Sequence, residues 1–78
     1  MVQIKLSNII TSLENKLGSK SRYSLFTDEY IMSNVTEQKL LENGFEFKGY
    51  DNSKKYPIYR FENIEGIFDK GVLHLYQL

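Results

Sequence analysis

The sequence predicts an α+β domain in which two short helices precede an antiparallel meander of three or four strands. Apolar residues recur at helical spacing in the first half of the chain and alternate with polar residues from Phe45 onward. Eight of the eleven aromatic rings lie between Phe45 and Tyr76, which is typical of strands. Because 78 residues are too few for two independent cores, residues 1–78 are expected to form a single small domain.

The first helix is predicted over residues 7–17. Ser7 is expected to cap its N-terminus, and Gly18 supplies the left-handed residue that ends many helices. Residues 1–6 fit either a short strand or a helical extension. The apolar face follows from spacings of four, three and four positions, at Leu6, Ile10, Leu13 and Leu17.

The segment between the two predicted helices carries weak local signals. A polar loop leads to a brief extended piece at residues 23–26. Thr27 is then expected to cap a turn containing Asp28 and Glu29, since acidic residues suit a helix N-terminus. The apolar run at residues 30–32 is too short to assign.

The second helix is predicted over residues 36–43. Thr36 offers an N-cap oxygen, and Leu40 and Leu41 form the apolar face. Gly44 is expected to end the helix because glycine adopts a positive φ at little cost.

Residues 34–50 resemble a segment of small uncharacterised proteins from phages and prophages of Bacteroidetes-type bacteria. In those proteins a helix of the form T-E-x-x-L-L-x-x-G-F leads into aromatic-rich strands. The resemblance implies a phage-encoded accessory or host- and defence-modulating protein in the host cytoplasm, with no catalytic residues to carry over. The matching positions are Thr36, Glu37, Leu40, Leu41, Gly44 and Phe45.

Period-two alternation predicts the strands of the second half. A strand is expected over residues 56–62, with Tyr59 and Phe61 on one face and Ile58 on the other. Residues 69–71 are expected to form a three-residue hairpin loop. The last strand, residues 72–78, is expected to leave an open edge for pairing with a partner or a second copy.

Composition excludes several classes of protein. The chain has no Cys, so disulfides and thiolate zinc sites are excluded. It has no apolar run long enough for a signal peptide or a membrane span, so a cytoplasmic protein is expected. The zero net charge is the sum of four blocks, +3 for residues 1–27, −4 for 28–47, +3 for 48–60 and −2 for 61–78, and it makes a homodimer plausible.

The sequence offers no constellation for catalysis, so we expect no enzyme activity and no cofactor. His74 is the single histidine, and Val72 and Tyr76 share its strand face. Asp51 opens a stretch similar to the start of a calcium loop, but Lys55 stands at a ligand position, so no metal is expected.

The sequence therefore favours a small binding module that acts by protein–protein contact, either with a partner or by self-association. The alternative is a nucleic-acid-binding domain in which cations of a tyrosine-rich hairpin contact phosphates. The candidate partner-binding residues are Tyr56, Ile58, Tyr59, Val72, His74 and Tyr76. The candidate nucleic-acid-binding residues are Lys48, Lys54, Lys55, Tyr56 and Arg60.

Overall fold

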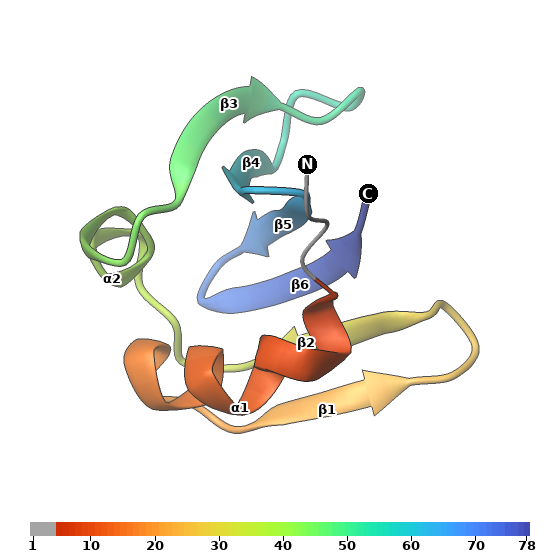
Figure 1. Cartoon of the computed structure of the whole chain (residues 1–78). Helices are drawn as coiled ribbons and strands as arrows, with labels where there is room; N and C mark the ends of the chain where they lie inside the picture. Colours follow the sequence, from red (N-terminus) through yellow and green to blue (C-terminus); the bar gives the residue numbers. More distant parts are fainter. Residues whose placement is uncertain (1–4) are drawn as a thin grey trace.

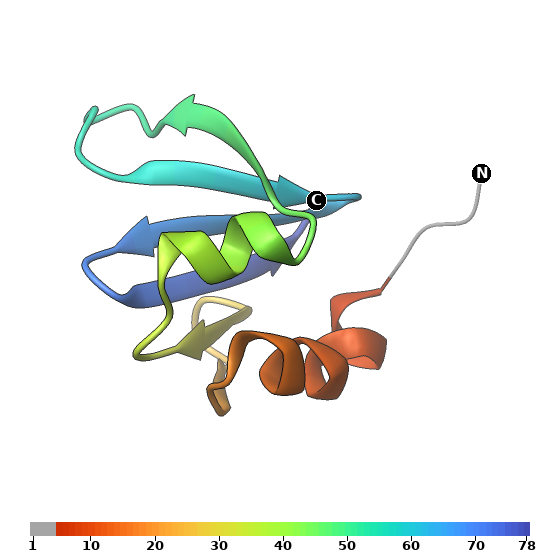
Figure 2. The same cartoon turned by 90° about the vertical axis from the view of Figure 1, so that its left-hand side faces the viewer.

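Residues 5–78 form, in a computed structural model of the chain, one antiparallel sheet with two helices on one face (Figure 1). The strand order is β1-β2-β6-β5-β4-β3, and Figure 2 shows both helices on the same side of these strands. The elements are α1 (Leu6–Leu17), β1 (Ser21–Ser24), β2 (Glu29–Met32), α2 (Glu37–Glu42), β3 (Glu46–Tyr50), β4 (Pro57–Phe61), β5 (Ile64–Asp69) and β6 (Val72–Gln77).

The predicted meander of three or four strands after two helices is wrong. The sheet of residues 5–78 has six strands, and two of them, β1 and β2, precede α2. This early hairpin joins the sheet because β2 pairs with β6, with Tyr30 opposite Leu75 and Ile31 opposite His74. Short strands gain most of their stability from such pairing and burial, which local sequence signals do not report.

The first helix is confirmed, but it begins one residue before the predicted cap. Its N-cap is Lys5, whose side chain makes no capping bond, and the Leu6 N–H donates to Gln77 Oε1 at 2.6 Å. Gly18 ends the helix with φ 71°, and its N–H donates to the Glu14 carbonyl at 2.9 Å. Residues 1–4 of the undecided segment lie outside the described residues.

The second helix is confirmed, and both of its predicted ends are found. Thr36 is the N-cap and its hydroxyl accepts from the Lys39 N–H at 3.2 Å. Gly44 has φ 89°, and the Phe45 N–H then donates to the Leu40 carbonyl at 3.0 Å. Neither helix of residues 5–78 is long and apolar enough to cross a membrane.

The hairpin turn between β5 and β6 is tighter than predicted. Asp69 pairs with Val72, so the loop consists of two residues, Lys70 and Gly71, with φ values of 47° and 89°. The turn between β4 and β5 likewise has a residue with positive φ, Glu62 at 54°. The paired positive φ values of Lys70 and Gly71 match the right-handed twist of the strands, which explains why a two-residue loop suffices there.

The hydrophobic core lies between the helices and the sheet. Inward-facing residues of β4, β5 and β6 alternate with residues that face away from the helices. The buried side chains of this core are Leu6, Leu13, Leu17, Met32, Val35, Leu40, Phe45, Tyr59, Ile64, Phe68, Leu73 and Leu75.

Gly66 lies in the middle of β5, beside core leucines of the neighbouring strand β6. A Cβ atom at this position would lie 2.9 Å from Leu73 Cδ1 and 3.1 Å from Leu75 Cδ2, and both leucines are fully buried. We therefore expect Gly66→Ala to lower the free energy of unfolding by about 1–2 kcal/mol, because close-packed neighbours must shift. Urea denaturation measures this loss. Combining Gly66→Ala with Leu73→Val should cost less than the sum of the single changes, whereas strictly additive losses would contradict the steric explanation.

Candidate partner-binding face

The face of the sheet opposite the helices, named here the open face, carries an apolar row that crosses four neighbouring strands. Direct cross-strand pairs link Ile58 to Ile67, Ile67 to His74, and His74 to Ile31. Directly opposed residues lie on the same face, so these four side chains are neighbours. All four are half-buried although both helices of residues 5–78 lie on the other side of the sheet (Figure 2).

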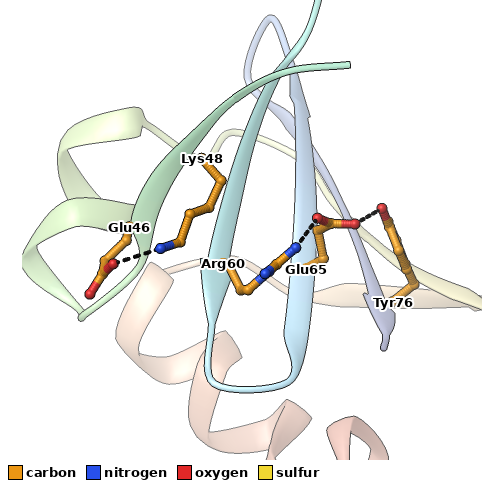
Figure 3. A network of polar contacts seen from close by, with 5 residues as sticks. All are labelled: Glu46, Lys48, Arg60, Glu65 and Tyr76. Atoms are coloured by element: carbon orange, nitrogen blue, oxygen red, sulfur yellow. Dashed lines mark hydrogen bonds and ion pairs between the residues drawn. The ribbon is translucent and has the colours of Figure 1, made fainter. Parts of the chain in front are cut away.

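A polar network lies beside the apolar row on the open face. Arg60 on β4 and Glu65 on β5 form an ion pair with Nη2 and Oε1 3.1 Å apart, and the Tyr76 hydroxyl of β6 donates to the other oxygen of Glu65 (Figure 3). Burial, followed by this hydrogen bond, raises the pKa of Tyr76 to about 12. The carboxylate of Glu65 therefore holds a cation on one side and a protonated phenol on the other.

His74 completes this arrangement at the β2 side of the face. Its Nδ1 lies 3.1 Å from Glu29 Oε1, and the side chains of the pair are 31% and 22% exposed. Its cross-strand neighbours are Ile31 and Ile67, so the imidazole ring lies in the apolar row, and Glu29 contacts one of its two ring nitrogens. This is the geometry of a histidine held in a sheet surface.

The chemistry of the open face suits contact with another protein. Its centre consists of three isoleucines and His74, and the polar groups described beside them, Arg60, Glu65, Tyr76 and Glu29, each have a partner. Polar groups that already have hydrogen-bond partners lose less free energy on desolvation than free ones. An apolar centre with a polar rim is typical of protein–protein interfaces.

Four of the six residues predicted to bind a partner lie on the open face. They are Ile58, Val72, His74 and Tyr76, since the alternation along β4 and β6 places them together.

The other two predicted partner-binding residues lie elsewhere. Tyr59 is a core residue, 3% exposed, and its hydroxyl donates to Glu37, so its selection as a surface residue is wrong. Tyr56 lines a separate surface pocket of about 220 Å³ with Phe68 and Lys70.

Sequence reasoning missed two members of the apolar row, Ile31 and Ile67. Ile67 shares its strand parity with Glu65 and Asp69, so alternation along β5 could have placed it on the outward face. Ile31 had no such signal, because its strand was not predicted.

The predicted open edge at residues 72–78 is wrong. β6 lies between β2 and β5, and β4 lies between β5 and β3, so each of these two strands has a paired strand on both sides, with β2 opposite residues 73–75 of β6. The edges of the sheet are β1 and β3 instead. β3 carries Lys48, and its register shifts next to Gly49, which has φ 108°. A lysine and a bulge are devices that discourage edge pairing.

The predicted nucleic-acid-binding residues fall into two groups, those paired with glutamates and those in an exposed loop. Lys48 Nζ lies 3.0 Å from Glu46 Oε2, and Arg60 is paired with Glu65 (Figure 3). The exposed side chains of Lys54 and Lys55 lie in the loop between β3 and β4.

The side chain of Asp51 organises that loop by accepting hydrogen bonds from residues that follow it. Its Oδ1 accepts from Ser53 Oγ at 2.9 Å, from the Lys55 N–H at 3.1 Å and from the Tyr56 N–H at 3.2 Å. Burial acts to raise the pKa of Asp51, but these hydrogen bonds outweigh it and hold the pKa below its usual value. The stretch that is similar to a calcium loop is thus a hydrogen-bonded turn, and residues 5–78 contain no cluster of three His, Asp or Glu suited to a metal ion.

Comparison with known proteins gives no family for this fold. No protein-family model matches the chain, and neither the curated proteins nor the solved structures give a significant match.

Proposed function

We propose that the chain is a small non-enzymatic module that binds proteins through the open face. The observation that carries the proposal is the apolar row of Ile31, His74, Ile67 and Ile58, in register across four strands on the face without a helix in residues 5–78. Half-buried aliphatic side chains gain further stabilisation when a partner removes them from water. The paired polar groups beside the row supply the rim of such an interface.

The nature of the ligand follows from the charges on this face. Arg60 and Lys48 are each neutralised by a glutamate, so the face offers little net attraction for phosphates. The resemblance of residues 34–50 to small phage proteins favours a host protein as the partner. The alternative partner for the same face is a second copy of the chain.

The test compares Ile67→Lys with Ser12→Lys, which adds the same charge at an exposed position of α1. The partner is first recovered with the wild-type chain from extracts of the source cells, or a dimer is detected by sedimentation. The affinity of that complex is then measured for each variant. Replacing a hot-spot residue weakens binding about 30-fold, and Ile67 lies in the middle of the row, so we expect that weakening in Ile67→Lys and no change in Ser12→Lys. Equal affinity of the two variants, with circular dichroism showing both folded, would contradict the proposal.

An oligonucleotide titration in the same series tests the alternative function. Binding that weakens steeply with salt, and that is lost when Lys54 and Lys55 are replaced by alanine, would support a nucleic-acid-binding domain in place of a protein-binding one. The open-face proposal expects no binding of single- or double-stranded oligonucleotides at low salt.

A further inference from the structure

The turn that joins β1 to β2 presents two large apolar side chains to solvent. Phe26 is 99% exposed and Leu25 is 84% exposed. Figure 1 shows this turn at the far end of the β1–β2 hairpin, projecting beyond the neighbouring strands. Exposure this complete means that neither side chain contributes to the core of residues 5–78.

Contacts within the hairpin hold this tip in shape. The Tyr23 hydroxyl donates to Asp28 Oδ1 at 2.6 Å, and the Tyr23 and Tyr30 rings lie 5.0 Å apart. Asp28 has φ 54°, and Ser24 pairs with Glu29 to close the loop. The loop that carries the two apolar side chains is thereby preorganised, which lowers the entropy lost on binding.

We infer that Leu25 and Phe26 form an anchor that inserts into an apolar pocket on a protein partner. A projecting aromatic residue with an adjacent aliphatic one fills a pocket, whereas the open face is suited to a flat surface. The inference rests on the proposed function only in that the ligand is a protein. It adds a second contact at the end of the sheet, on residues that the open face does not use.

Charge near the tip favours a protein pocket over a lipid surface. Asp28 and Glu29 follow Phe26 closely, and the nearest basic residue along the chain is Arg22. Loops that enter anionic membranes usually combine apolar residues with Lys or Arg, because acidic groups are repelled by the negative surface potential.

A photo-crosslinking residue at position 26, compared with the same residue at position 41, tests the inference. Leu41 is also an exposed apolar residue, 55% accessible, but it lies on α2 away from the tip. In extracts of the source cells, position 26 is expected to give one dominant crosslinked protein that position 41 does not give. That protein, purified, is then titrated with Leu25→Ser/Phe26→Ser and with Leu41→Ser. We expect about a 30-fold loss of affinity in the first and less than a twofold change in the second.

Four outcomes would overturn the inference. The first two are identical crosslinked proteins from positions 26 and 41, and unchanged affinity of Leu25→Ser/Phe26→Ser for the purified protein. The third is Phe26-dependent flotation of the wild-type chain with phosphatidylcholine–phosphatidylserine vesicles. The fourth is a dimer of the chain that forms only when Phe26 is present. Because the tip side chains are exposed, the double variant should keep the thermal stability of the wild type. Failure here is distinct from failure of the proposed function, since Ile67→Lys tests the open face alone.

Discussion

Phe45→Ala is expected to lower the free energy of unfolding by about 3–5 kcal/mol, the usual cost of removing a buried ring. Phe45 is 2% exposed, and its ring lies 5.4 Å from that of Phe61. It follows Gly44 at the point where α2 turns into β3, so it anchors both elements to the core. A domain of 78 residues has only about 4–12 kcal/mol of stability in total. The variant should therefore lie close to unfolding at room temperature.

Chemical denaturation followed by circular dichroism measures this loss. Phe45→Leu, which keeps most of the volume, should cost less than about 1.5 kcal/mol. Phe47→Ala is the matched control because Phe47 is an exposed aromatic residue on β3. A loss in Phe45→Ala no larger than the loss in Phe47→Ala would contradict the assigned position of the core.

Stability is expected to fall as the pH rises from about 10 to about 12. Burial and a hydrogen bond to Glu37 raise the pKa of Tyr59 to about 12, and the pKa of Tyr76 is also about 12. Tyrosine in an unfolded chain loses its proton near pH 10, so the unfolded state releases protons first in this interval. The stabilisation is complete below pH 10 and is lost as the pH approaches 12. The carboxylate of Glu37 is exposed, so solvent weakens its hydrogen bond to Tyr59, and we expect about 2 kcal/mol from the two tyrosines together.

The measurement is the free energy of unfolding as a function of pH for the wild type and for Tyr59→Phe/Tyr76→Phe. The double variant keeps the rings but lacks both hydroxyl groups. It should be less stable at neutral pH, and its stability should change less between pH 10 and pH 12. Equal slopes for the two proteins would show that these phenols do not carry the alkaline transition.

The sequence predicted the elements whose limits depend on neighbouring residues. Gly18 ends α1 and Thr36 caps α2 through hydrogen bonds that span only a few positions. Alternation in residues 56–62 correctly separated Tyr59 from Ile58, because side chains of a strand point in turn to opposite faces. For the candidate site, the same alternation placed Val72, His74 and Tyr76 on one strand face, as they lie in the structure, and their role in binding stays a prediction.

Contacts between distant residues decided the rest. α1 begins at Leu6 because Gln77, 71 positions away, accepts its N–H. The tertiary structure alone places β2 beside β6, and this pairing brings Ile31 next to His74 and Glu29 within 3.1 Å of it. Local propensity gives a four-residue strand little preference for any partner, so the register that assembles the open face arises only when the whole sheet forms.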